Sequence, residues 1–339
     1  MRTFLIALAL RSVSIAGCSV EREDSSLEVK MLSPVPIAKH NDLIYDIGMH
    51  KGEDAEFYLR KGFRVVAFEA DPDLIVSCKE RLKEFLERGK LTIVEGAIVP
   101  AEPNGTFPKT VRFYKNRDVS VWGTVLADWA ERNACIGTPS SIIEVKAVDF
   151  SGAIRKYGVP HFMKIDIEGC DAVCIAALDG FEEKPTYLSI ESDKTSIENV
   201  ERELDLLHKL GYLTFQAVEQ SKIPRTQHPP YPTREGDYAK QQFEPGSSGL
   251  FGLELGGKWK SKGEIMRQYR FILFGYYLTG DGGVMTKWTF PGARLIRFVT
   301  RRLVGLLTHA EVPGWYDTHA RHACADDSRP NDLALGQRR

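Results

Sequence analysis

Two carboxylates close together are the first residues in this chain to which chemistry can be assigned. Asp166 and Glu168 belong to a segment, 161–167 and the residues just after it, whose apolar run predicts a strand. Alternation along a strand would place both side chains on one side, together with Lys164. Such a pair could position a substrate hydroxyl, act as a base or hold a metal ion. Alternatively, Lys164 and backbone amides satisfy the pair without any chemical role.

A glycine-containing turn earlier in the chain is a second candidate site. Residues 46–52 read Asp-Ile-Gly-Met-His-Lys-Gly and stand between an expected strand and an expected helix. The two glycines allow a tight turn and a close approach of the backbone to a ligand. His50 occupies the place of the second glycine in the dinucleotide motif, which argues against a dehydrogenase. Asp46, at the end of the strand, could meet an ammonium group or an ordered water.

The residues after this turn indicate which ligand it could bind. Three acids open the next helix and would repel a pyrophosphate: Glu53, Asp54 and Glu56. Lys51 offsets this effect only in part. Glu69 lies 21 residues after Gly48, at the position of the acid that contacts ribose hydroxyls in nucleoside-binding α/β folds. A turn that disfavours phosphate, combined with a ribose acid, fits S-adenosylmethionine.

The elements that must position these residues alternate between about residues 41 and 220. Apolar runs predict strands at 43–47, 64–69, 91–94, 110–114, 142–148, 161–167, 186–191 and 212–218. Amphipathic periodicity and end signals predict helices at 53–61, 72–88, 150–157, 170–179 and 196–210. This alternation indicates a doubly wound α/β fold, with a mostly parallel sheet covered on both faces. The strand carboxyl ends then share one edge, where ligands bind.

Composition excludes several classes of protein. The chain has 339 residues, of which 43% are hydrophobic and 27% charged, as is usual for a globular protein. The net charge of −1 gives no overall electrostatic footprint for nucleic acid, so we expect no nucleic-acid partner. Six cysteines are too few for a disulfide scaffold in a chain of this length. The cluster near His319 and His322 fits no strong zinc pattern, and we predict no metal.

Three segments together resemble the FkbM-type S-adenosylmethionine-dependent methyltransferases. They read DIGMHKGED from residue 46, VVAFEADP from residue 65 and MKIDIEGCD from residue 163, in the family's order and spacing. The run KIDIEG is the family's most distinctive signature, and the resemblance covers roughly residues 41–220. Cys170 stands where the family commonly has a small residue such as alanine. The later segments 246–259 and 315–320 are similar to one bacterial subgroup.

The resemblance implies a class I methyltransferase (Rossmann-like) fold, with a seven-stranded sheet whose last strand is antiparallel. It implies S-adenosyl-L-methionine as the cofactor and methyl transfer, usually to a hydroxyl oxygen. Glu69 would take the ribose, residues 96–98 would border the adenine, and Asp166 and Glu168 would face the transferring methyl as the catalytic candidates. The residues expected to bind the donor are Asp46, Gly48, His50, Gly52, Glu69, Asp71, Gly96, Ala97 and Asp166.

The sequence leaves the acceptor and the general base open. Asp166, Glu168 and His50 are all candidates for the base. The acceptor could be a sugar, a glycan, a lipid or another small metabolite that carries a hydroxyl. A catalytically inactive methyltransferase fold that binds a ligand or a membrane is the alternative, although the intact glycines and Glu69 favour an enzyme.

The two ends of the chain give further expectations. Residues 4–18 are similar to a lipoprotein signal that would be lipidated at Cys18, but Arg11 interrupts the apolar run. A cytosolic donor favours a cytoplasmic protein over this alternative. The predicted divisions are an N-terminal segment, the methyltransferase domain, a C-terminal helical extension and a disordered tail, at 1–40, 41–255, 256–322 and 323–339.

Residues 292–308 predict a basic amphipathic helix, in which arginines interleave with large apolar residues. Such a helix could lie on an anionic membrane surface or hold a polymeric acidic acceptor. The alternative is a helix packed on the core with its arginines in water. The oligomeric state stays open.

Overall fold

The computed structural model describes most of the chain after residue 33. The described residues are 34–135, 137–192, 196–280, 283–308 and 315–325. The predicted signal or lipidation site around Cys18 lies outside the described residues, and so does the predicted disordered tail from 326 onward. The first residues of that tail, 323–325, are instead ordered in a turn after the last strand, where the Ala323 amide donates to the Gly211 carbonyl at 3.0 Å. Within the described part of the chain, no helix is long and apolar enough to cross a membrane.

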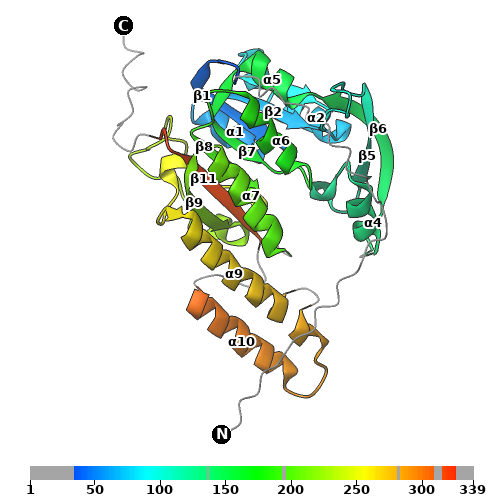
Figure 1. Ribbon diagram of the computed structural model, residues 1–339, viewed down its shortest axis with the longest axis vertical. Helices are drawn as coiled ribbons and strands as arrows, with labels where there is room; N and C mark the ends of the chain where they lie inside the picture. Colours follow the sequence, from blue (N-terminus) through cyan, green and yellow to red (C-terminus); the bar gives the residue numbers. More distant parts are fainter. Residues whose placement is uncertain (1–33, 136, 193–195, 281–282, 309–314, 326–339) are drawn as a thin grey trace, which may run out of the picture. The chain divides into compact units, whose positions relative to one another are not determined.

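An eight-stranded sheet forms the centre of the fold, in the order β10-β9-β11-β8-β7-β1-β2-β3 (Figure 1). Within the run β8-β7-β1-β2-β3, every pair of neighbouring strands is parallel. β11 runs antiparallel to both β8 and β9. The direction of winding reverses between β1 and β7, which creates a ligand crevice at the carboxyl ends of these strands. The predicted doubly wound, class I fold is confirmed, but the sheet has eight strands where seven were expected, because the two-residue strand β10 pairs with β9 at its edge. The strands are β1 (Lys39–Ile47), β2 (Arg64–Glu69), β3 (Leu91–Glu95), β7 (Val159–Ile165), β8 (Tyr187–Glu191), β9 (Tyr212–Glu219), β10 (Lys260–Ser261) and β11 (Tyr316–His322).

The strand that completes the sheet comes from the end of the chain. β11 inserts between β8 and β9 and pairs with both. A methyltransferase domain that ends at residue 255 is therefore too short, and 256–322 is more than a helical extension. The strand was hard to predict because its sequence, Tyr-Asp-Thr-His-Ala-Arg-His, is polar. Its partners on both sides still bury Asp317, Thr318 and His319.

Helices and loops cover both faces of the sheet. One apolar cluster joins Tyr45 and Met163 of the sheet to α5, α6, α7 and α9, and a second joins Ile44 and Phe162 to α1, α2 and the loop around Phe251. Asp71, Asp149 and Ser196 cap helices with their side chains, as turn-forming residues do at helix starts. The helices of this part are α1 (Glu53–Arg60), α2 (Pro72–Arg81), α3 (Lys83–Glu87), α5 (Phe150–Tyr157), α6 (Asp171–Ala177) and α7 (Ile197–Lys209).

One predicted helix is divided in two. The periodicity over 72–88 predicted a single helix, but Leu82 leaves helical geometry with φ −107° and ψ 21°. This break buries the Leu82 side chain to 1% exposure, against the turn that precedes α1. Tertiary packing therefore overrides the local helical pattern at this position.

A small second sheet is inserted between β3 and α5. It has the order β4-β6-β5 and is joined to α4 by a loop that contains a 3₁₀ helix (Figure 1). The strands predicted at 110–114 and 142–148 are both present. These elements are β4 (Ala97–Ile98), β5 (Thr110–Asn116), β6 (Ser140–Val148), the 3₁₀ helix (Ser120–Trp122) and α4 (Ala127–Cys135).

Two long helices precede β11. Tyr269 of α9 is tied to the sheet, because its hydroxyl lies 2.7 Å from Ser192 Oγ and 2.6 Å from Thr318 Oγ1. α10 packs alongside α9 (Figure 1), and Arg301 donates to the Thr279 carbonyl at 2.7 Å. The remaining elements are α8 (Ile223–Thr226), α9 (Lys262–Thr279), α10 (Ala293–Thr308) and short 3₁₀ helices at Leu178–Gly180, Gln220–Lys222, Gly252–Glu254 and Val284–Lys287.

Candidate active site

The turn after β1 is held by its backbone against both neighbouring strands. The amides of Gly48 and Met49 donate to the Phe68 carbonyl at 3.1 and 3.0 Å. Gly48 has φ +86°, and a Cβ atom there would lie 1.9 Å from the Asp166 carbonyl oxygen. Only glycine lets the turns after β1 and β7 come this close. Chain packing thus requires the glycine that was predicted to make room for a ligand.

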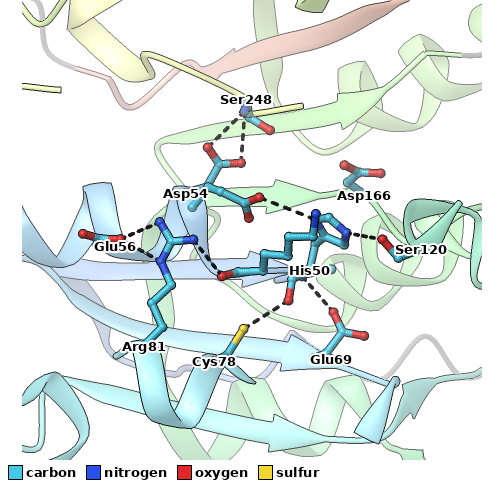
Figure 2. A network of polar contacts seen from close by, with 12 residues as sticks. His50, Asp54, Glu56, Glu69, Cys78, Arg81, Ser120, Asp166 and Ser248 are labelled. Carbon is cyan, nitrogen blue, oxygen red and sulfur yellow. Dashed lines mark hydrogen bonds and ion pairs between the residues drawn. The ribbon is translucent and has the colours of Figure 1, made fainter. Parts of the chain in front are cut away.

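Gly52 begins α1 but does not contact the ligand crevice. A Cβ atom at Gly52 would lie 3.0 Å from Leu82, so the residue packs against the junction of α2 and α3. Asp54, in the first turn of α1, is buried and accepts the Ser248 amide with both carboxylate oxygens at 3.0 Å (Figure 2). Burial raises the pKa of Asp54, although Lys164 and the Ser248 amide act in the opposite direction.

A buried ammonium group joins the turns after β1 and β7. Lys164 Nζ donates to the Gly48 carbonyl at 3.0 Å and lies 3.4, 3.6 and 3.7 Å from the carboxylates of Asp46, Asp54 and Asp166. Burial raises the pKa of Asp46 to about 7, while Lys164 lowers it. Burial also lowers the pKa of Lys164, but these carboxylates raise it by more. Asp46, which was expected to bind the donor or to meet an ammonium group, lies beside the ammonium group of Lys164.

Glu69 is the most firmly held of the predicted donor residues. Its Oε1 accepts the amides of Ala70 and Asp71, and its Oε2 accepts the His50 amide, each at 2.8 Å. Burial raises the pKa of Glu69, and these three hydrogen bonds oppose the rise. The Asp71 side chain makes other contacts. It caps α2, and its Oδ1 accepts from Lys115 of β5 at 2.6 Å. Asp71 therefore positions the inserted sheet against the crevice.

His50 connects the turn after β1 to the inserted segment. It has φ +52°, and its Nε2 lies 2.8 Å from Ser120 Oγ (Figure 2). Its Nδ1 lies 3.7 Å from Glu53, and its carbonyl accepts from Cys78 Sγ at 3.1 Å. Both ring nitrogens thus face protein groups, and the imidazole links the turn after β1 to the loop that carries Ser120.

Neither acid of the predicted catalytic pair lies on the strand. β7 ends at Ile165, just before Asp166, and Glu168 stands in the following turn with φ +47°, so strand alternation does not place the two side chains. Asp171 shapes this turn by accepting the amides of Ile167 and Gly169, each at 3.2 Å. Burial and the nearby charge of Asp166 raise the pKa of Asp171 to about 6. Asp171 is a positioning residue that was not singled out, although an acid at a helix start was a visible signal.

A pocket with about 700 Å³ of empty space, part of it open to solvent, lies at the carboxyl ends of β1, β2 and β7. Asp46 and Gly52 do not line it. Eight of the predicted site residues do: Gly48, His50, Glu69, Asp71, Gly96, Ala97, Asp166 and Glu168. Among the described residues, no group of three or more His, Cys, Asp or Glu side chains is arranged to hold a metal ion.

The far wall of the pocket comes from the inserted segment, which sequence reasoning missed. The loop between β5 and α4 contributes Ser120, Val121, Gly123, Thr124 and Val125, and β5 contributes Phe113. Thr124 Oγ1 donates to the Glu168 carbonyl at 2.9 Å, so this loop also fixes the turn after β7. The region reads as irregular in the sequence and carries no motif, because only long-range contacts bring it to the crevice.

The lining of the pocket fits a cationic nucleoside. No Lys or Arg appears among its described lining residues. Four carboxylates line it, those of Glu69, Asp71, Asp166 and Glu168. This charge suits a sulfonium or an ammonium group and opposes a pyrophosphate. Apolar side chains supply a surface for a purine: Phe68, Leu74, Ala97, Ile98, Phe113 and Val125. The residues present therefore fit S-adenosylmethionine.

A family comparison agrees with this geometry. Residues 46–214 match the model of the methyltransferase FkbM domain, a span that runs from the end of β1 to the start of β9. The chain belongs to the FkbM methyltransferase family. The predicted enzyme class, a methyltransferase that uses S-adenosylmethionine, is confirmed by this membership. In this FkbM domain, the matched span includes both turns of the crevice and the inserted sheet.

Solved structures resemble the FkbM chain only distantly. Precorrin-6y C5,15-methyltransferase from Geobacter metallireducens is 13% identical, with a TM-score of 0.29, over 55% of this chain and 72% of that chain. Methyltransferase FkbM from Methylobacillus flagellatus is 20% identical, with a TM-score of 0.27, over 45% of this chain and 33% of that chain. A SAM-dependent methyltransferase from Archaeoglobus fulgidus is 12% identical, with a TM-score of 0.33, over 82% of this chain and 85% of that chain. No curated protein matches the sequence.

Proposed function

We propose that this protein methylates a hydroxyl oxygen of a sugar, a glycan or another small metabolite in the cytoplasm, where its donor is made. The observation that carries the proposal is the pocket, which has Glu69 on one side and Asp166 and Glu168 on another. Carboxylates can accept a hydrogen bond, and then a proton, from an acceptor hydroxyl.

Donor binding is assigned to the edge of β2. Glu69 Oε2 accepts a single amide, from His50, so this oxygen has a lone pair left for a ribose hydroxyl. The apolar wall around Ala97 and Ile98 suits the adenine. When bound, S-adenosylmethionine supplies a methyl group already activated on a cationic sulfonium. The acidic lining around Asp166 suits that charge.

The chain itself has to align the acceptor, exclude water and take up a proton. The loop that carries Ser120 closes one side of the pocket through its contact with His50. Asp166 is the base that we propose, because its side chain is 41% exposed beside the Lys164 ammonium group. His50 is less suited, since Ser120 and Glu53 face its two ring nitrogens.

The donor site can be tested by calorimetric titration of the full chain with S-adenosylhomocysteine. We expect saturable one-to-one binding, weakened roughly 10- to 100-fold in Glu69→Gln, as is typical for loss of a hydrogen bond to a charged group. Glu80→Gln, at an exposed position of α2, is the matched control. Because Glu69 also holds three backbone amides, thermal melts must show that each variant is folded. Folded wild-type protein that fails to bind would refute the donor assignment.

The acceptor and base are tested by a methyl-transfer assay on a panel of sugars, oligosaccharides and hydroxylated metabolites. Asp166→Asn should lower kcat by roughly 10²- to 10⁴-fold and leave the affinity for S-adenosylhomocysteine nearly unchanged. Donor binding without methylation of any hydroxyl, together with methylation of an amine, would replace the oxygen acceptor by nitrogen. Unchanged kcat in Asp166→Asn would remove Asp166 from the role of base.

A further inference from the structure

Large apolar side chains gather on the two helices that precede β11. Of twenty exposed large hydrophobic residues in the described chain, eleven fall between Phe271 and Leu303. On α9, Phe271, Phe274 and Tyr277 repeat every third residue, and Phe274 is 57% exposed. Scattered exposed apolar residues are normal, but a concentration of this kind marks an interaction surface.

The apolar stripe of α10 points away from the protein. Leu295, Val299 and Leu303 stand four residues apart and share one side of the helix, with Leu295 66% exposed. The buried residue Ala293 and the half-buried Thr300 lie on a different side, where α10 packs onto its neighbours. A helix that only packed on the core would bury the stripe. The stripe is therefore available to a partner.

The same segment is strongly basic. Residues 265–308 contain one acid, Asp281, and seven bases, although the chain as a whole has a net charge of −1. The bases are Arg267, Arg270, Lys287, Arg294, Arg297, Arg301 and Arg302. We define the surface formed by the exposed residues of 267–303 as the basic apolar surface.

We propose that the basic apolar surface binds an anionic lipid membrane, with its apolar side chains in the acyl boundary and its arginines at the headgroups. Helices with exposed apolar and arginine-rich sides are typical of this binding mode, and the loop before α10 adds the exposed aromatic residues Trp288 and Phe290. A second copy of the chain is a poorer occupant, because an isologous contact would bring two sets of basic residues together. A nucleic acid would match the charge but leave the exposed apolar stripe without a partner.

The test is co-sedimentation of the full chain with vesicles of phosphatidylcholine, alone or mixed with phosphatidylglycerol. We expect binding only to the anionic vesicles, a decrease with added salt, and a blue shift of the emission of Trp288 that Trp288→Phe removes. Arg294→Gln combined with Arg302→Gln should weaken binding about 30-fold, given the usual contribution of each cation at an anionic surface. Leu295→Ser combined with Val299→Ser should weaken it at least about tenfold.

Matched controls lie elsewhere on the exposed surface. Val76→Ser on α2 and Arg225→Gln on α8 change the same residue types outside the basic apolar surface, and both should bind like the wild type. Residues 1–33 are identical in all variants, so any membrane affinity of that segment cancels. Equal binding by α10 variants and wild type, or no vesicle binding at all, would overturn the proposal. A concentration-dependent dimer that Leu295→Ser dissolves, without vesicle binding, would overturn it in favour of self-association.

Discussion

Replacing Lys164 by methionine should destabilise the protein by about 3 to 5 kcal/mol at pH 7 and above. The Lys164 side chain is 5% exposed, and its ammonium group lies within 3.7 Å of the carboxylates of Asp46, Asp54 and Asp166. Methionine has a similar length but removes the charge, so Asp46 and Asp54 become buried acids without a cation beside them. The predicted loss of stability is the one typical of a buried ion pair from which one partner is removed.

The pH dependence of this loss follows from the pKa of Asp46. Burial raises that pKa from 3.8 to about 7, so the folded state binds the proton more tightly than the unfolded state does. The contribution of Asp46 to the free energy of unfolding therefore falls as pH rises from about 3.8 to about 7. Lys164 lowers this pKa, and its removal enlarges the fall. The difference between variant and wild type should accordingly be small near pH 4 and largest above pH 7.

Urea unfolding, followed by circular dichroism at several pH values, measures this difference. Lys90→Met, at an exposed position before β3, is the matched control and should change stability by less than about 0.5 kcal/mol. Asp46→Asn added to Lys164→Met should restore part of the loss, because it removes one of the uncompensated charges. A loss below about 1 kcal/mol, or one that does not vary with pH, would refute the electrostatic reasoning.

Three further predictions test the framework of the site. Gly48→Ala should cost at least about 2 kcal/mol in urea unfolding, because it combines φ +86° with a Cβ atom 1.9 Å from a carbonyl oxygen. Gly89 also has positive φ, but a Cβ atom there would meet nothing within 4 Å, so Gly89→Ala should cost no more than about 1 kcal/mol. Equal losses of stability in the two variants would contradict the steric clash at Gly48. Tyr269→Phe should lose about 1 to 2 kcal/mol, because Ser192 and Thr318 lose a buried partner, and an unchanged melting temperature would contradict this. Truncation after residue 315 should abolish cooperative unfolding, because β8 and β9 lose β11 between them, and a truncated protein that still melts cooperatively would show that β11 is dispensable.

The sequence alone determined the α/β alternation and most of the pocket floor. Strand β2 and helix α5 have the predicted bounds, because strong apolar patterns and glycine stops are local signals that later packing did not override. Gly48 and Glu69 were identifiable for the same reason, since a turn of positive φ and an acid at a strand end are encoded within a few residues. The three segments that resemble the FkbM family then indicated one ligand for these residues, S-adenosylmethionine.

Only the tertiary structure decided which groups face one another. Asp46 has the spacing of a donor ligand, yet the register of β1 with β7 sets it beside Lys164. The loop with Ser120 closes the pocket through contacts between residues about 70 positions apart, which no local pattern encodes. β11 is polar and distant in sequence, but it completes the sheet because β8 and β9 bury it on both sides. Local periodicity fixes which element forms, whereas pairing partners and exposure are settled only when the whole chain has packed.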